Sequence, residues 1–148
     1  MLKKTYLMIF AITVLVFSIS ESEAGCNGSC SYIEEGDWIV TEDTHMYDQE
    51  LNVNDITVSA GVEFKLENVN ATITGQVTLN SDTTWIRSNI AHAKTANETN
   101  ITVNEKLEII STNITVNATG DAYDFSYVQG IYVSETGYLI IRDIDANP

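Results

Sequence analysis

Basic residues are scarce in this chain of 148 residues: seven lysines and arginines stand against 21 aspartates and glutamates, which gives a formal net charge of −14. The five that follow residue 24 are scattered through the sequence, at Lys65, Arg87, Lys94, Lys106 and Arg142. Binding to nucleic acid depends on clustered cations that release counterions from the phosphate backbone, and a polyanion cannot do this. The composition therefore excludes nucleic acid from the expected partners.

Only two cysteines and two histidines are present. Cys26 and Cys30 are separated by three residues, and in an oxidising compartment they could close a small disulfide loop. His45 and His92 are solitary and expected to be solvated, so the sequence offers no set of zinc ligands. A Ser-His-Asp order, a glycine-rich phosphate loop and a CxxC motif are absent as well. We therefore expect no resident metal and no cofactor, with calcium as an open possibility discussed below.

Long hydrophobic runs are absent except near the N-terminus, where residues 6–19 are apolar apart from one threonine and one serine. A run of about 14 residues is shorter than the roughly 20 that a transmembrane helix needs. Lysines precede it, and small residues follow at Ser22 and Ala24, which is the order of a signal peptide cleaved before Gly25. We expect residues 1–24 to form a signal-peptide helix and the mature protein to be secreted or to lie at the cell surface.

Two other interpretations of the N-terminus stay open. The segment could remain as an uncleaved membrane anchor, or a lipid could be attached at Cys26, because residues 24–26 resemble the end of a bacterial lipobox. Glu23 stands where that motif has leucine. Contact with a membrane is thus expected only through this segment or through a lipid on Cys26.

Proline is absent before Pro148, and no segment after Trp38 shows a helical period. Apolar and polar residues instead alternate over short runs, such as 56–58, 64–66 and 77–79, which glycine and asparagine punctuate. Such alternation predicts strands, and without proline each strand can join a regular ladder. The sequence therefore predicts an all-β fold.

Four segments can be laid over one another, each with two short strands around a turn. They begin at Ile56, Val77, Ile101 and Ile131, at intervals of 21, 24 and 30 residues, which is typical of solenoid coils with variable loops. One such unit cannot bury its own apolar stripe, so the units must stack. The alignment places in line Val58, Leu79, Val103 and Val133 in the first strand, Leu66, Ile86, Ile110 and Ile141 at the end of the second, and Val69, Ile90, Ile114 and Ile144 beyond it.

The turn after the second strand of each unit is polar. Stacked polar side chains at such a turn can form hydrogen bonds along the solenoid axis, although ordinary turns have the same composition. Both interpretations stay open for these residues: Asn68, Ser88 with Asn89, Thr112 with Asn113, and Asp143.

We predict a right-handed parallel β-helix of about four coils in residues 56–148, with an N-terminal cap and first strand in residues 25–55. An antiparallel β-sandwich is the alternative that strand spacing alone permits. No cap is evident at the C-terminal side, where an open coil would expose unpaired backbone. We therefore expect truncation, continuation in a separate reading frame or end-to-end association.

Three stretches resemble secreted right-handed parallel β-helix proteins of archaea: GDWIV at 36–40, ITVSAGVEFKLENV at 56–69 and YVQGIYVSETGYLIIRD at 127–143. The resemblance covers residues 36–148 and implies a pectate-lyase-like solenoid used for adhesion, envelope structure or carbohydrate handling. This chain would be an N-terminal fragment of such a protein. Solenoids of this type include lyases, hydrolases, adhesins and inert spacers, so the resemblance predicts the fold and leaves the function open.

Six N-x-[ST] sequons suit an exported glycoprotein. Those expected in loops, at Asn97, Asn100 and Asn117, are the favoured sites, whereas Asn70 and Asn113 are expected to be buried near turns and unmodified. The six sequon asparagines are Asn27, Asn70, Asn97, Asn100, Asn113 and Asn117.

The longest insertion between strands, residues 117–130, brings acidic and aromatic residues together. The plainest expectation is that its aromatic rings anchor the loop while its acids face water. A sugar-binding surface or a calcium site is the alternative, because rings stack on sugars and carboxylates bind calcium. The residues are Asp121, Tyr123, Asp124, Phe125 and Tyr127.

We expect no catalytic residues. No motif pairs two carboxylates as a glycosidase requires, and Arg87 and Arg142 are expected to point outward from the coils. The leading hypothesis is a noncatalytic secreted or cell-surface structural or adhesion protein, with cell-surface glycans or envelope proteins as partners. The alternative is the N-terminal part of a carbohydrate-binding or polysaccharide-cleaving β-helix protein.

Overall fold

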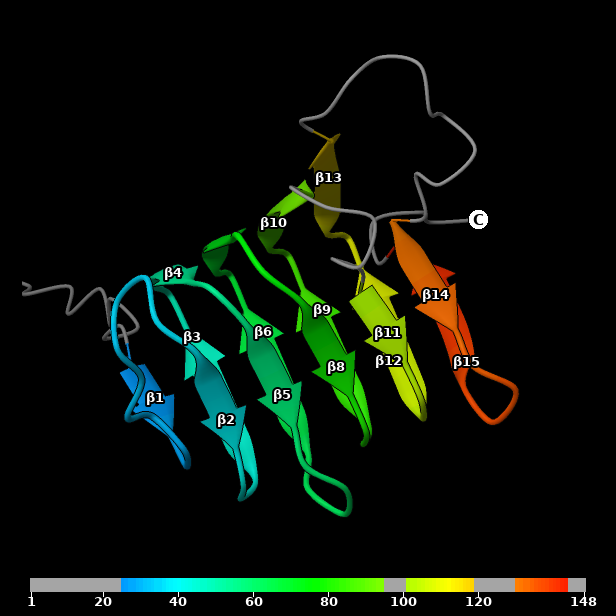
Figure 1. Ribbon diagram of the computed structural model, residues 1–148, viewed down its shortest axis with the longest axis horizontal. Helices are drawn as coiled ribbons and strands as arrows, with labels where there is room; N and C mark the ends of the chain where they lie inside the picture. Colours follow the sequence, from blue (N-terminus) through cyan, green and yellow to red (C-terminus); the bar gives the residue numbers. More distant parts are fainter. Residues whose placement is uncertain (1–24, 95–100, 119–129, 144–148) are drawn as a thin grey trace, which may run out of the picture.

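The computed structural model describes residues 25–94, 101–118 and 130–143, and every regular element in them is a strand. None of the described segments is a helix that could cross a membrane. The strands lie in three sheets that wrap around one core, and successive turns of the chain stack into a parallel β-solenoid (Figure 1). The predicted signal-peptide helix at residues 1–24 lies outside the described residues.

The three sheets are called A, B and C. Sheet A contains β1 (Gly25–Asn27), β3 (Thr44–Tyr47), β6 (Phe64–Glu67), β9 (Thr83–Ile86), β12 (Lys106–Ile110) and β15 (Tyr138–Arg142). Sheet B contains β2 (Trp38–Val40), β5 (Ile56–Val58), β8 (Val77–Leu79), β11 (Ile101–Val103) and β14 (Ile131–Val133). Sheet C contains β4 (Glu50–Val53), β7 (Asn70–Ile73), β10 (Asn89–Lys94) and β13 (Asn113–Ala118).

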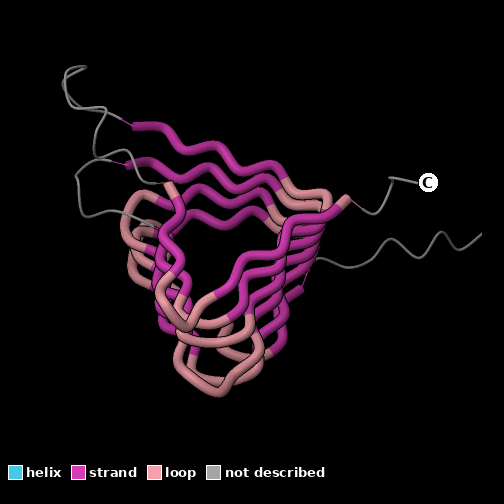
Figure 2. The backbone as a smooth tube through the Cα atoms, turned by 90° about the vertical axis from the view of Figure 1, so that its right-hand side faces the viewer, coloured by secondary structure: helices cyan, strands magenta, loops and turns pink. Residues whose placement is uncertain are grey.

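The chain passes through sheets B, A and C in turn, and Figure 2 shows the three sides of the resulting coil. Neighbouring strands are parallel, except that β1 is antiparallel to β3. This arrangement confirms the predicted all-β parallel β-helix and excludes the antiparallel sandwich.

The first strand of each repeat has the predicted register. Val58 lies opposite Leu79, Leu79 opposite Val103, and Val103 opposite Val133. The alignment began at Ile56, whereas the structure extends the column to Val40, because β2, β3 and β4 stack on β5, β6 and β7. The segment expected as cap and first strand therefore contributes strands to all three sheets.

The predicted register of the second strand was wrong by one residue. Leu66 lies opposite Trp85, and Trp85 opposite Ile109, whereas Ile86 lies opposite Glu67 and Ile110 on the outer side. Because adjacent side chains of a strand point to opposite faces, this shift turns Trp85 and Ile109 toward the core, although Ile110 is also shielded, at 7% exposure. Trp85 is the inward residue and is fully buried.

A third strand in each turn, in sheet C, was not foreseen. Its inward positions include Ala71 and His92, which are buried but are not the large apolar residues that alternation usually reveals. The expected alignment of Val69 with Ile90 is wrong as well, because Ile90 lies opposite Ala71 and Ile114. Residue 144, expected to follow in this column, lies outside the described residues.

Hydrogen bonds between coils support the stacking interpretation of the polar turns. Buried Ser88 accepts a hydrogen bond from the Val69 amide at 3.1 Å, and the Ser88 amide donates to the Thr112 hydroxyl at 3.1 Å. On the adjoining outer edge of sheet C, the side-chain amide of Asn113 donates to the side-chain oxygen of Asn89. The side-chain amide of Asn89 donates in the same way to Asn70. Ser111 donates to the Asp143 carboxylate at 2.7 Å.

The corner between sheets A and C repeats the same backbone conformation. Positive φ angles of 54°, 53°, 47° and 44° occur at Asp48, Asn68, Arg87 and Ser111, which each follow a strand of sheet A. Asparagine and aspartate tolerate this left-handed region better than most residues, whereas arginine seldom adopts it. The corner thus directs the chain into sheet C, and it places these side chains beside one face of sheet A.

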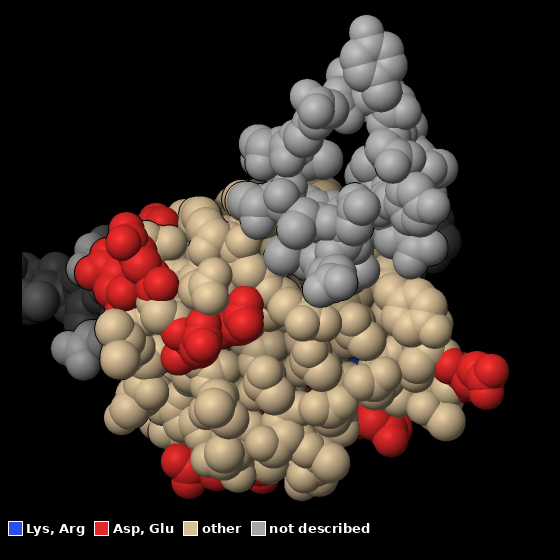
Figure 3. All heavy atoms as spheres, in the orientation of Figure 1, with Lys and Arg blue, Asp and Glu red and all other residues tan. Residues whose placement is uncertain are grey.

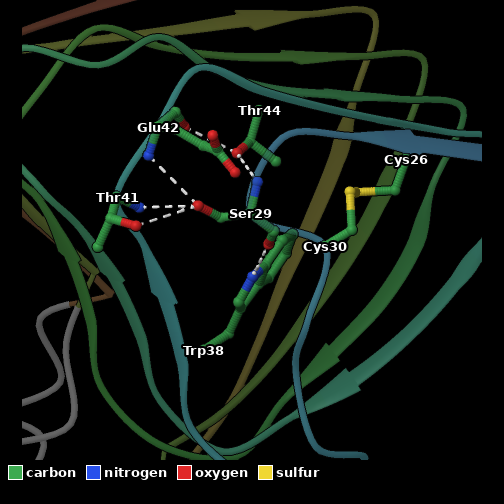
Figure 4. The surroundings of a disulfide bond; sticks show 7 residues. All are labelled: Cys26, Ser29, Cys30, Trp38, Thr41, Glu42 and Thr44. Carbon is green, nitrogen blue, oxygen red and sulfur yellow. Dashed lines mark hydrogen bonds between the residues drawn. A yellow bond between two sulfur atoms is a disulfide. The ribbon is translucent and has the colours of Figure 1, made fainter.

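The N-terminal end is closed by a short disulfide loop (Figure 4). Cys26 and Cys30 are joined with a Cα–Cα distance of 5.8 Å, and β1 lies along β3. Ser29 connects the loop to the first coil: its carbonyl accepts the indole N–H of Trp38, and its hydroxyl accepts the Thr41 amide. These contacts hold the loop against the start of the solenoid.

Candidate functional site

The outer face of sheet A and its edges bring together basic residues that are distant in the sequence. Lys65 and Arg87 contact Glu67, Lys106 contacts Asp82, and Arg142 contacts Glu108, with nitrogen–oxygen distances of 2.5–3.0 Å. Cations that are scattered along the chain are therefore gathered by the register of the coils on one side of the molecule. The other side, which includes sheet B, is uncharged over much of the area in Figure 3, with acidic groups along its margins and one acidic group within the face.

Glu67 is the centre of the densest cluster. One carboxylate oxygen lies 2.7 Å from Lys65 Nζ and 3.2 Å from His45 Nε2, and the other lies 2.8 Å from Arg87 Nη2. Three successive coils supply these groups, because His45 lies in β3, Lys65 and Glu67 in β6, and Arg87 after β9. Arg87 and Arg142 point outward as expected, each with 61% of its side chain exposed.

The cluster borders a concavity of about 530 Å³ on this face. Its wall includes an aromatic pair, since the rings of His45 and Tyr47 lie 5.2 Å apart. At its edge the Asn68 amide donates to the Asp48 carboxylate. The lining residues are His45, Tyr47, Asp48, Glu67, Asn68 and Arg87. An aromatic ring beside fixed donors and acceptors is a surface that can bind a polar ligand.

The charges of this site are fixed. The hydrogen bond from Lys65 and, to a smaller extent, that from Arg87 hold the pKa of Glu67 below the ordinary value of 4.5, against an opposing effect of burial. The hydrogen bond from Lys106 to Asp82 likewise raises the pKa of that lysine. A carboxylate in this state has no proton to donate at neutral pH. Within the described part of the chain, no group of three or more His, Cys, Asp or Glu residues could hold a metal ion.

The lowered pKa of Glu67 should make the stability of the fold depend on pH. Because its pKa in the folded state is lowered, the ionised carboxylate stabilises the fold above pH of about 4.5, and this stabilisation is lost as the pH falls through the lowered pKa. The Glu67→Gln variant should unfold at lower urea concentration than wild type at neutral pH, and the two should converge in acid. Urea unfolding measured across the acidic range checks this. A constant difference at every pH would show that the ion pairs contribute nothing.

The structure also corrects the two histidine predictions. His45 belongs to the Glu67 cluster, although its sequence context predicted a solvated residue. His92 was expected in a loop, but it lies in β10 with no exposed surface and with Nε2 2.7 Å from the Gly75 carbonyl oxygen. The strand that contains His92 was hidden because alanines occupy both neighbouring positions.

Three sequons have described side chains. Asn27 is exposed at the end of β1, and Asn70 and Asn113 are exposed on sheet C, so the expectation that the latter two are buried was wrong. Both belong to the row of asparagines on the outer edge of sheet C, where the side-chain amide of Asn70 also donates to the Glu50 carboxylate at 3.0 Å. They point outward because they begin strands whose next residue faces the core. Asn117 lies in β13, but its side chain is not described.

Other predicted site residues lie outside the described residues. They are the sequons Asn97 and Asn100 and the candidate ligand surface formed by Asp121, Tyr123, Asp124, Phe125 and Tyr127.

Comparison with protein-family models, with curated proteins and with solved structures found no significant match to this chain. Of what the resemblance implied, the structure shows the stacked parallel β-solenoid.

Proposed function

We propose that the protein is a noncatalytic secreted or cell-surface protein whose β-helix serves as a structural or adhesive scaffold. The observation that carries the proposal is the state of Glu67, which is held ionised by two cations at 2.7 and 2.8 Å. Acid–base catalysis needs a group that can gain or lose a proton near the working pH. This carboxylate is instead a fixed part of an ion-paired surface.

Export is the second part of the proposal. The short Cys26–Cys30 disulfide favours an oxidising compartment, in agreement with the signal peptide expected at residues 1–24. The same disulfide uses the Cys26 sulfur that lipid attachment would need. The resemblance to pectate-lyase-like archaeal β-helix proteins and the glycosylation of exposed sequons are further parts of this proposal.

Intact-mass analysis of the protein exported by expressing cells tests it. We expect a product that begins at Gly25 and gains mass with an alkylating reagent only after reduction, because both cysteines are bonded. A Cys30→Ser variant is the matched control, since its Cys26 should react without reduction. A product that retains residues 1–24, or one with an acyl group on Cys26, would contradict the proposal.

A carbohydrate-binding role is a second candidate, favoured by the His45–Tyr47 pair in the concavity. If it is correct, a glycan array should show binding that Tyr47→Ala abolishes and that Thr78→Ala, on sheet B, leaves unchanged. Release of sugar fragments from a bound polysaccharide would indicate the polysaccharide-cleaving alternative. Absence of binding across the array favours the scaffold.

A further inference from the structure

The concavity on sheet A presents hydrogen-bond donors and acceptors in neighbouring pairs. Arg87 supplies guanidinium N–H groups beside the Glu67 carboxylate, and Asn68 supplies a side-chain amide beside the Asp48 carboxylate. A hydroxyl group both donates and accepts hydrogen bonds, whereas a carboxylate only accepts them and an ammonium group only donates them. A ligand rich in hydroxyl groups therefore fits this lining better than a ligand that carries charge of one sign.

The charges in and beside the concavity do not favour an anion. Lys65 and Arg87 both contact Glu67, at 2.7 and 2.8 Å, so each positive charge already faces a carboxylate. An adjoining hollow of about 230 Å³ is lined by Asp43 and Glu63 as well as by Lys65. These acids, with a formal net charge of −14 for the whole chain, repel an anionic ligand.

Glu67 is held between the two cations. Its side chain is only 25% exposed, and His45 Nε2 lies 3.2 Å from the oxygen that also contacts Lys65. Because the hydrogen bonds from Lys65 and Arg87 lower the pKa of Glu67, the carboxylate carries its charge at neutral pH. An acidic ligand would have to displace Glu67 from both cations before it could bind them.

Tyr47 supplies the flat apolar surface on which a sugar ring can stack. Gly25 packs directly on this side chain, because a Cβ atom at position 25 would collide with the Tyr47 hydroxyl. The antiparallel pairing of β1 with β3 places the two residues opposite one another, and His45 lies beside the tyrosine ring. The ring is therefore held in place before a ligand arrives, which lowers the cost of binding.

We propose that the concavity binds neutral saccharides and that Glu67 excludes acidic ones, such as uronates, by neutralising Lys65 and Arg87. This inference rests on the carbohydrate-binding role given above as the second candidate function. Selectivity often depends on an element that disfavours the wrong ligand as well as on contacts with the right one. Glu67 is that element, and it determines the charge class of the ligand.

A glycan array tests the proposal with the exported protein at neutral pH. The probes are neutral hexose oligosaccharides, oligouronates and hexosamine oligosaccharides with free amines, all of matched length. Wild type should bind the neutral class, and Tyr47→Ala should weaken this binding by about tenfold or more, as for the loss of an aromatic anchor. Added sodium chloride should leave the wild-type binding unchanged, because the ligand has no charge to screen.

Glu67→Gln is the decisive variant. It leaves Lys65 and Arg87 without their carboxylate, so its affinity for oligouronates should exceed that of wild type by about tenfold or more, as expected for a hydrogen bond to a charged group. This gained binding should weaken as sodium chloride is added.

Glu108→Gln is the matched control for the change of charge. It also removes a carboxylate from an ion pair of sheet A, with Arg142, but neither residue lines the concavity. We expect it to keep the wild-type preference for neutral sugars. Circular dichroism checks that both variants are folded.

The outcomes separate this inference from the function on which it rests. A wild-type preference for a charged class of sugar would overturn the inference and leave the carbohydrate-binding role standing. An unchanged preference in Glu67→Gln would do the same. If neither wild type nor Glu67→Gln binds any sugar on the array, the carbohydrate-binding role fails and the inference fails with it.

Discussion

Replacing Trp85 with alanine is expected to lower the free energy of unfolding by about 3 kcal/mol, the lower end of the range for a buried tryptophan. The side chain is fully buried and lies in register between Leu66 and Ile109, so its loss leaves a cavity within the stack. The lower end applies because the indole N–H has no hydrogen-bond partner among the described residues, and truncation removes this buried donor as well. Equilibrium unfolding in urea measures the change.

Ile86→Ala is the matched control for that result. Ile86 is the next residue in β9, and it lies opposite Glu67 and Ile110 on the outer side of sheet A. We expect a loss of about 1 kcal/mol or less, because the side chain is outside the core. If Ile86→Ala were the more destabilising variant, the register of sheet A would be shifted by one residue.

Replacing Ser88 with alanine is expected to cost about 1–3 kcal/mol, because it leaves a buried backbone donor without an acceptor. The Ser88 hydroxyl accepts from the Val69 amide and donates to the Ile86 carbonyl at 2.8 Å, and Ser88 is only 2% exposed. Water cannot take its place without opening the turn. Urea unfolding again provides the measurement.

Asn70→Ala provides the comparison for Ser88. Asn70 also links coils, through Glu50 of the preceding coil and Asn89 of the following one, but it lies on the exposed edge of sheet C. Water can replace its hydrogen bonds, so we expect a loss below about 1 kcal/mol. Equal effects at the two positions would show that burial does not determine how much these contacts stabilise the stack.

The sequence was sufficient to predict the strands of sheet B from β5 onward because their inward residues are branched and apolar. Val58, Leu79 and Val103 each end a three-residue alternation, so their alignment is unambiguous. In sheet A, two apolar residues follow one another at Trp85-Ile86 and alternation alone cannot decide which one faces the core. In sheet C, buried His92 and Ala71 carry no such signal.

The candidate site could not be predicted because it depends on register between coils. The partners in the Glu67 cluster include Arg87, which is 20 residues away, and His45, which is 22 residues away. These separations match the length of one coil and could have indicated the cluster. The sequence alignment, however, began at Ile56 and left out the coil that contains His45 and Tyr47. Once β3 is stacked on β6, the cluster follows from the sequence.

Nuclear Overhauser effects between backbone protons test the stacked parallel register most directly. We expect contacts that link Val58 to Leu79 and Leu79 to Val103, without close contacts between α-protons of these strands. Short α-proton contacts should occur between β1 and β3, the antiparallel pair. Such contacts between β5 and β8, or a register shifted by one residue, would contradict the parallel solenoid.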